Sequence, residues 1–356
     1  MKVSAINPIS FRAKIIDAHA HIGKHEGVIY EKSGLDVFTK TPLPNSDNVV
    51  TMLVSSLDVI HSEKSELVGN RALLSEISSC PQYRAFAACS PRDGNVANIK
   101  TLFKENPNVF IGLKFHPSVQ NLPLNDPKYI PYLNFASKHN IPCLFHTAVD
   151  VDNQFGKLIQ GTVNISDPAK VYELAKKYPK TPFVMAHMGA GWNEAHDKAI
   201  EVLVNSIKNG DANLYADISW VNIDHSKNHI IKAIKSLKGV GQEGWEFGDQ
   251  SFRLIFGTDA PLDRFSSNEA REIYSKYIED IKAAIRNDVD LKSEAEAIID
   301  NLFHNNAQKL YLQAKDKKIH SSKVLIAMSI PLLALLTSGI IYLNKRMKQH
   351  NSKLNK

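Results

Sequence analysis

Eight short apolar runs, separated by stretches of helical character, constrain the fold of this 356-residue chain most. Buried strands alternating with helices are typical of parallel β-strands that helices cover. Eight such units in about 300 residues predict a closed (β/α)8 barrel, the TIM barrel. An open doubly wound sheet is the alternative, but no glycine-rich turn follows the first run. The predicted strands are Lys14–Ile16, Asn48–Ser55, Tyr83–Cys89, Phe110–Phe115, Pro142–His146, Phe183–His187, Asn213–Asp217 and Leu254–Gly257.

Helices are expected between these strands. Asp167 followed by Pro168 is typical of a helix start, and Pro179 predicts where that helix ends. The connections 22–47 and 150–166 are long, and we expect them to act as lids over a site. The other predicted helices are Val96–Glu105, Tyr129–His139, Glu194–Lys208, His229–Ser236 and Asn268–Arg286.

The C-terminal part of the chain differs from the rest. Residues 324–343 contain no charge and have about the length that spans a bilayer core of roughly 30 Å. A basic linker at 315–323 precedes this run and a basic tail at 344–356 follows it. A buried terminal helix is the alternative. We expect a barrel domain at 14–314 and a transmembrane helix at 324–343. Without a signal peptide this helix would be a tail anchor, with the barrel in the cytoplasm.

The positive charge of the chain belongs to this C-terminal part. Residues 315–356 hold nine Lys or Arg and one acid, whereas the whole chain carries +6, so the barrel domain is slightly acidic. The basic segments suit anionic lipid headgroups, and the acidic barrel argues against nucleic acid as a partner. Three cysteines without CxxC spacing fit a reducing compartment. The oligomeric state is not indicated.

Asp17, His19 and His21 alternate directly after the first apolar run, so their side chains share one face of the strand. Two imidazoles held in this way can each give a ring nitrogen to one divalent metal. An isolated His-x-His pair is usually solvent-facing, so the interpretation depends on what the other strands carry.

Polar residues also end the other predicted strands. In a barrel these ends meet on one face, where the chemistry occurs. Each residue alone has a simpler explanation as a core, turn or surface residue, but together they indicate a site. They are Lys114, His116, His146, His187 and Asp259.

These motifs resemble the amidohydrolase superfamily, in particular the amidohydrolase-related branch with aminocarboxymuconate-semialdehyde decarboxylase and aromatic-acid decarboxylases. The resemblance implies that His19, His21, His146 and Asp259 hold a metal. It also implies that His187 is a catalytic acid or base, or a ligand of a second metal. The motifs are DAHAH at 17–21, GLKFHP at 112–117, LFHTA at 144–148, MAHMGAGW at 185–192, FGTDAP at 256–261 and NLFHNNAQKLYL at 301–312.

Lys114 has two interpretations. In binuclear members of the superfamily a lysine on the fourth strand is carbamylated and bridges two metals. Alternatively, its ammonium group holds a substrate carboxylate beside a single metal. We expect one divalent metal, with zinc as the default. His116 shares the face of Lys114 and is a candidate for contact with substrate, and Arg92 and Arg264 are candidate carboxylate clamps.

The implied ligand set leaves the metal a position for water, whose pKa the ion lowers to about 7. Asp259 would take the proton of this water, and His187 would polarise a carbonyl or protonate a leaving group. We therefore expect a metal-dependent hydrolase of an amide, ester or lactone of a small molecule. The alternatives are a metal-dependent non-oxidative decarboxylase of an unsaturated or aromatic acid, and a membrane-tethered metal-binding scaffold without activity.

Overall fold

A computed structural model describes most of the barrel domain. The chain divides into two compact units, 1–311 and 312–356. The predicted basic linker, transmembrane helix at 324–343 and basic tail lie outside the described residues. No helix within the described ranges is both long and apolar enough to cross a membrane. Those ranges are 14–25, 27–45, 47–148, 151–152, 157–158, 165–190, 193–219, 223–240, 253–260 and 267–313.

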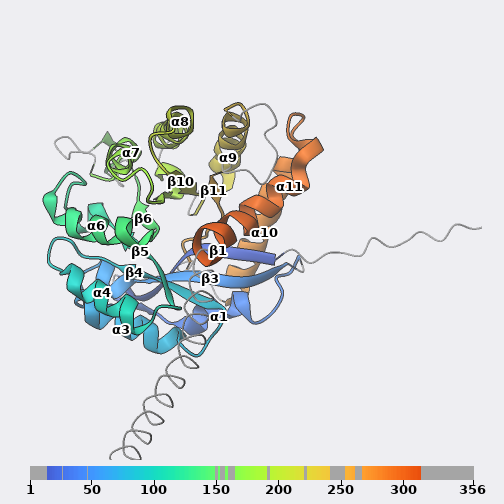
Figure 1. Cartoon of the computed structure of the whole chain (residues 1–356). Helices are drawn as coiled ribbons and strands as arrows, with labels where there is room; N and C mark the ends of the chain where they lie inside the picture. Colours follow the sequence, from blue (N-terminus) through green and yellow to red (C-terminus); the bar gives the residue numbers. More distant parts are fainter. Residues whose placement is uncertain are drawn as a thin grey trace, which may run out of the picture. The chain divides into compact units, whose positions relative to one another are not determined.

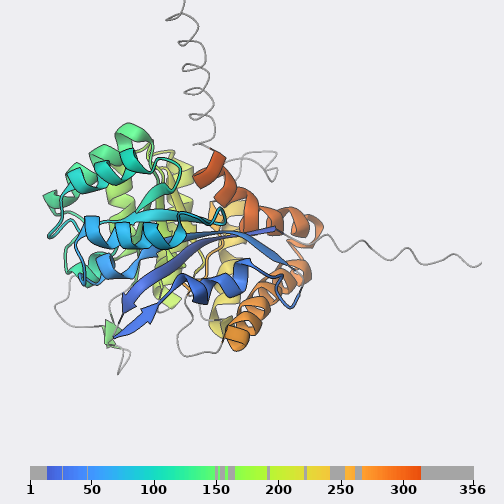
Figure 2. The ribbon, with the colours of Figure 1, turned by 90° about the horizontal axis from the view of Figure 1, so that it is seen from below.

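A curled sheet of nine strands forms the centre of the domain, and helices cover its outside (Figures 1 and 2). The strands are, in spatial order, β11 (Leu254–Ile255), β10 (Leu214–Asp217), β9 (Phe183–Ala186), β6 (Cys143–His146), β5 (Phe110–Phe115), β4 (Tyr83–Ala88), β3 (Asn48–Ser56), β1 (Lys14–His25) and β2 (Val28–Tyr30). Neighbours pair in parallel except β2, which forms an antiparallel hairpin with the end of β1. Strands β7 (Val151–Asp152) and β8 (Lys157–Leu158) form a separate antiparallel pair.

Backbone hydrogen bonds close this sheet into a barrel between β1 and the segment after β11. The amide of Ala18 donates to the carbonyl oxygen of Phe256 at 3.0 Å. The amide of Asp259 donates to the carbonyl oxygen of His19 at 2.8 Å. These bonds exclude the open sheet and confirm the predicted TIM-barrel fold, with β2 added outside the eight parallel strands.

The predicted helix after Asp167 is confirmed, because the Asp167 carboxylate accepts from the amide of Ala169 at 2.7 Å and caps the helix. The α-helices are α1 (Lys32–Thr39), α2 (Leu57–Ile60), α3 (Glu66–Ile77), α4 (Val96–Glu105), α5 (Pro117–Gln120), α6 (Ile130–His139), α7 (Pro168–Lys176), α8 (Asn193–Asn209), α9 (Ile223–Lys238), α10 (Ser267–Asn287) and α11 (Ala295–Asp300). Short helices of other types are η1 (Pro127–Tyr129), η2 (His187–Gly189), η3 (Lys292–Glu294), η4 (Asn301–Asn305) and η5 (Gln308–Gln313).

The connection 22–47, predicted as a lid, contains regular secondary structure. Strand β1 continues to His25, turns into β2 and leads to α1. Regular hydrogen bonding and the buried side chains of Leu35 and Phe38 tie this segment to the domain. Most of the second predicted lid, 150–166, lies outside the described residues.

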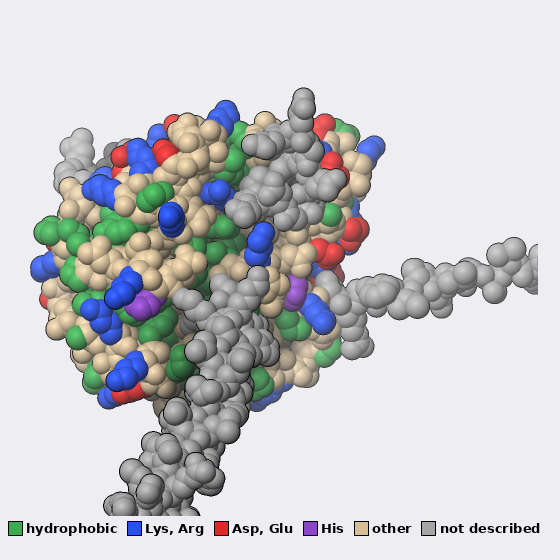
Figure 3. Space-filling view, in the orientation of Figure 1, with side chains coloured by type: hydrophobic (Ala, Val, Ile, Leu, Met, Phe, Trp, Pro, Cys, Tyr) green, Lys and Arg blue, Asp and Glu red, His purple; other side chains and the backbone are tan. Residues whose placement is uncertain are grey.

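Charged groups of both signs occur on the face shown in Figure 3, with apolar side chains between them.

The core consists of apolar side chains inside the barrel and between the sheet and its helices, such as Phe115, Phe145 and Phe183. The rings of Phe145 and Phe183 stack with centroids 5.4 Å apart. This packing fixes the middle strands whose ends carry the polar residues.

Gly257 allows the close approach of the closing segment to β1. A Cβ atom at Gly257 would lie 2.8 Å from His19 Cβ and 3.2 Å from the His19 amide nitrogen. Gly257→Ala should therefore lower the free energy of unfolding by about 1–3 kcal/mol in urea denaturation. Gly34 in α1 is the control, because a Cβ there meets no atom within 4 Å. Gly34→Ala should be neutral or stabilising by up to about 1 kcal/mol. Equal stability of the two variants would contradict this account.

Candidate metal centre

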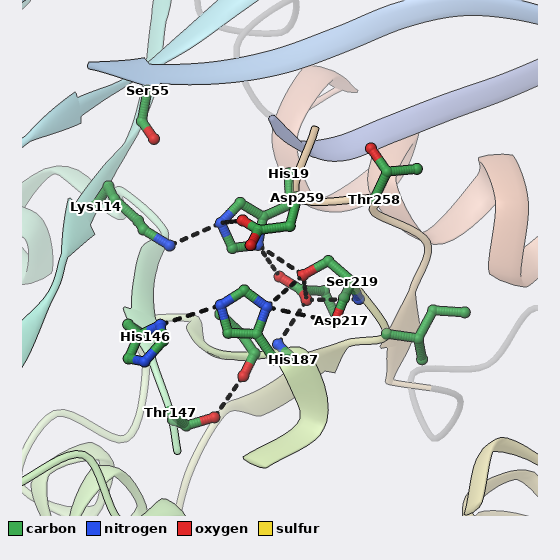
Figure 4. Close-up of polar contacts among 12 residues, drawn as sticks. His19, Ser55, Lys114, His146, Thr147, His187, Asp217, Ser219, Thr258 and Asp259 are labelled. Carbon is green, nitrogen blue, oxygen red and sulfur yellow. Dashed lines mark hydrogen bonds and ion pairs between the residues drawn. The ribbon is translucent and has the colours of Figure 1, made fainter. Parts of the chain in front are cut away.

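Potential metal ligands from β1 and from the closing segment converge at the carboxyl end of the barrel (Figure 4). His19 Nε2 lies 3.3 Å from Asp259 Oδ1, and His21 Nε2 lies 2.9 Å from the same oxygen. Two imidazole nitrogens and a carboxylate oxygen are a donor set that suits zinc and related divalent metals. These three residues therefore fit the metal that the sequence resemblance implies.

The backbone is held in the left-handed region at two residues of the site. The φ angles are 61° at His187 and 63° at Asp259, a conformation that costs a non-glycine residue about 1–3 kcal/mol. Asp17 holds the turn before Asp259, because its carboxylate accepts from the Thr258 amide at 3.1 Å and from the Thr258 hydroxyl at 2.6 Å. It also accepts from the Tyr274 hydroxyl at 2.9 Å. Asp17 thus orients backbone, and burial raises its pKa to about 6.

Hydrogen-bond partners on the far side of the rings orient the two histidines of β1. Asp217 Oδ2, at the end of β10, lies 3.0 Å from His19 Nδ1. An ionised carboxylate only accepts, so His19 carries its proton on Nδ1 and presents the Nε2 lone pair to the site. Ser55 Oγ, at the end of β3, lies 2.9 Å from His21 Nδ1. Both rings therefore direct Nε2 toward Asp259.

Ser219 connects Asp217 to the two histidines that end β6 and follow β9, His146 and His187, and so orients their rings as well. Its hydroxyl donates to Asp217 Oδ1 at 2.5 Å, and its oxygen lies 2.8 Å from His187 Nδ1. An oxygen that has used its proton accepts, so His187 donates from Nδ1. His187 Nε2 then accepts from His146 Nδ1 at 3.1 Å. This chain leaves the Nε2 lone pair of His146 available to a metal.

His146 is not among the groups of converging ligand atoms found in the described residues. Its ring instead stacks on His116, with centroids 3.8 Å apart and an interplanar angle of 12°. His116 Nδ1 accepts from the Val119 amide at 3.3 Å, so its Nε2 carries the proton. The fourth-ligand role of His146 stays a prediction. A second group of atoms, from His19, His187 and Asp217, is bridged by the Ser219 hydroxyl.

Lys114 reaches the same point from β5. Its side chain is almost completely buried, and its Nζ lies 2.7 Å from His19 Nε2 (Figure 4). Burial lowers the pKa of Lys114 to about 8, while Asp259 and Asp217 act against this shift. The site therefore contains a buried amine directly beside the nitrogen that a metal would use.

Burial also sets the charge of the remaining groups. It lowers the pKa of His19 and His21, and it lowers the pKa of His187 to about 4. Burial alone would raise the pKa of Asp259, but His187 and His19 hold it well below its usual range. Neutral imidazoles and an ionised carboxylate are the forms that bind metal.

The two arginines proposed as carboxylate clamps differ in position. Arg92 Nε donates to Asp93 at 2.7 Å, and its Nη1 donates to the carbonyl oxygen of Gln120 at 3.1 Å. Its guanidinium is thus engaged at an exposed ion pair. Arg264 lies outside the described residues.

Sequence reasoning missed three orienting residues: Asp217, Ser219 and Ser55. Asp217 ends a predicted strand in the same way as His146 and His187, so the strand-end rule applied to it as well. Ser55 also ends a predicted strand, but serine is too common at such ends to be singled out. Ser219 follows its strand by two residues and carried no signal.

A family model described as amidohydrolase matches residues 16–312 of the chain. No curated protein matches the chain. Solved structures share the fold at low sequence identity. 2,6-Dihydroxybenzoate decarboxylase from Rhizobium has a TM-score of 0.52 and 15% identity, covering 84% of this chain and 98% of the other. An amidohydrolase from Burkholderia multivorans with bound zinc has a TM-score of 0.52 and 12% identity, covering 84% and 99%.

A third structure is 5-carboxyvanillate decarboxylase from Novosphingobium aromaticivorans, complexed with manganese and 4-hydroxy-3-methoxy-5-nitrobenzoic acid. It has a TM-score of 0.51 and 12% identity, and the match covers 84% of this chain and 96% of the other. At such identities these likenesses establish the barrel fold and leave the reaction to be argued from the site.

Replacing Asp217 should weaken metal binding without removing a ligand. Asp217→Asn removes the charge that holds the proton on His19 Nδ1, so the affinity for Zn²⁺ should fall about 10–100-fold in calorimetric titration of the full chain. Asp211→Asn is the control, because Asp211 is bound to the Tyr172 hydroxyl at 2.8 Å. Equal affinity of Asp217→Asn and the unaltered protein would show that Asp217 does not orient a ligand.

Proposed function

The chain belongs to the amidohydrolase family, and we propose that it is a metal-dependent, non-oxidative decarboxylase of an unsaturated or aromatic acid. Members of this family are metal-dependent enzymes, and the donor set of His19, His21 and Asp259 suits such a metal. The expectation of hydrolysis becomes the second candidate. Zinc and manganese are the metals present in the related structures.

The observation that carries this proposal is the buried amine of Lys114. A buried cation is costly unless a negative group compensates it. Among the described residues, Lys114 Nζ donates to His19 Nε2 and bonds to no carboxylate. Asp259 and Asp217 favour the charged amine only through space, whereas a carboxylate substrate would give it a direct ion-pair partner at the place where the metal ligands meet. An amide, ester or lactone brings no such charge.

The metal would be held by His19, His21 and Asp259, with His146 as the proposed fourth ligand, and it would supply Lewis-acid stabilisation of negative charge. Lys114 would hold the carboxylate of the substrate. His116 would donate from Nε2 to a second oxygen of the substrate, because its Nδ1 is used by α5. These contacts would fix the carbon that bears the carboxylate near His187.

His187 is the proposed proton carrier in this reaction. Its Nδ1 is held by Ser219, so its Nε2, which must first release the hydrogen bond from His146 Nδ1, is the atom that can take up a proton and pass it on. The proton goes to the carbon that bears the carboxylate. The bond between this carbon and the carboxylate carbon then breaks. Its electron pair stays on the carbon framework that received the proton, and CO2 leaves. The net change consumes one proton for each CO2 released.

The solved structures support this proposal by what their names state. Two of the three described above are decarboxylases of benzoic acids, from Rhizobium and from Novosphingobium aromaticivorans. An aromatic or unsaturated acid can accommodate the electron pair left by CO2, which a saturated acid cannot do. Arg264 lies outside the described residues and stays a candidate second clamp for the substrate carboxylate.

Hydrolysis of an amide, ester or lactone is the second candidate. The observation in its favour is Asp259, whose Oδ1 lies 2.9 Å from His21 Nε2 within the ligand group. A carboxylate in this position can take a proton from an attacking water. The zinc-bound amidohydrolase from Burkholderia multivorans agrees with this candidate.

Incubation of the full chain with aromatic and unsaturated acids should release CO2 when Zn²⁺ or Mn²⁺ is present. Chelation should abolish release and metal addition should restore it. His187→Gln should lower kcat by about 10²–10⁴-fold, the usual effect of losing an acid or base. His229→Gln on α9 is the control. Cleavage of esters or lactones without CO2 release would favour hydrolysis, and metal binding without any turnover would favour the scaffold.

We also propose that residues 324–343 anchor the protein in a membrane, with the barrel in the cytoplasm. The full chain should sediment with membranes and resist extraction by alkaline carbonate. The double variant Leu333→Arg/Leu336→Arg should be extracted, because each central arginine costs about 2.5–3.5 kcal/mol on insertion. Leu333→Ile/Leu336→Ile is the matched control. Extraction of the unaltered protein would exclude the anchor.

A further inference from the structure

The nitrogen of His19 that faces the site has one lone pair. Either the Lys114 amine or a metal ion can bind to it. Asp217 accepts from His19 Nδ1, so the second ring nitrogen, Nε2, is the acceptor. Lys114 Nζ lies 2.7 Å from this Nε2. A metal on His19 would use the same lone pair.

The metal and the Lys114 amine cannot both use the Nε2 lone pair of His19. A zinc ion binds an imidazole nitrogen at about 2.0–2.1 Å. The Lys114 amine already donates a hydrogen bond to this Nε2 from 2.7 Å, and an imidazole nitrogen has a single lone pair, so the ion and the amine cannot share it. One of the two has to leave before the other can bind.

Lys114 has little freedom to avoid this contact. Its backbone lies in the middle of the sheet, paired with Ala88 of β4 on one side and Leu144 of β6 on the other. Its side chain is 1% exposed. The amine therefore stays inside the barrel, and its nearby alternatives to His19 are groups in the site.

We propose that Lys114 is an internal competitor of the metal, which weakens metal affinity by occupying the Nε2 lone pair of His19. Metal binding breaks the Lys114–His19 hydrogen bond and releases the amine into the site. In the proposed decarboxylation, on which this last step rests, the released amine is the group that receives the substrate carboxylate. Metal loading then prepares the binding of substrate.

The test is the affinity of the full chain for Zn²⁺, measured by competition with a chromogenic chelator in the absence of substrate. Lys114→Met keeps the length of the side chain but removes the competing donor, so it should bind Zn²⁺ at least about tenfold more tightly, equivalent to 1.4 kcal/mol. Lys114→Gln retains a neutral donor and should lie between Lys114→Met and the unaltered protein. Lys232→Met on α9 is the matched control and should not change the affinity.

Unchanged or weaker binding by Lys114→Met, with the fold confirmed by thermal denaturation, would overturn the proposal. A fall from two bound metals to one would also overturn it, because this result would identify Lys114 as a carbamylated bridge. If Lys114→Met does not fold, the order of Lys114→Gln and the unaltered protein decides. Because no substrate is present, a failure of the decarboxylation proposal would not alter these outcomes.

Discussion

Hydrogen bonds between β1 and residues 256–260 close the barrel, and they also assemble the candidate metal centre. The same pairing that satisfies the backbone of the first and last strands places Asp259 beside His19 and His21. Asp17 strengthens this junction from below by holding Thr258, and Gly257 allows the close approach. The site is thus a consequence of closure, because its ligands come from the first strand of the barrel and from the segment after the last one.

The charges inside the barrel explain why the site can be stable without a large cost. Asp217 and Asp259 provide two buried or partly buried carboxylates, and Lys114 provides a buried amine. Histidines that burial keeps neutral lie between them. Ser219 links Asp217 to both His19 and His187, so one carboxylate orders several rings. A metal and an anionic substrate would enter a network that already contains their counter-charges.

The strands could be predicted from the sequence because each is a short apolar run. The site residues at their ends could be predicted because a barrel brings these ends together. The structure agrees closely at Phe110–Phe115 and at α4. The β1–β2 hairpin could not be predicted, since its residues after His21 carry no clear alternation. The contact of Lys114 with His19 and the order imposed by Ser219 depend on side-chain geometry across strands, which local patterns do not specify.

Elemental analysis of the purified full chain tests the central claim most directly, when it is carried out together with the double variant His19→Ala/His21→Ala. This account predicts about one equivalent of zinc, manganese or a related divalent metal in the unaltered protein and none in the folded variant. A folded, unaltered protein that holds no metal even after metal is added would contradict it. Equal metal content in the two proteins would place the metal elsewhere.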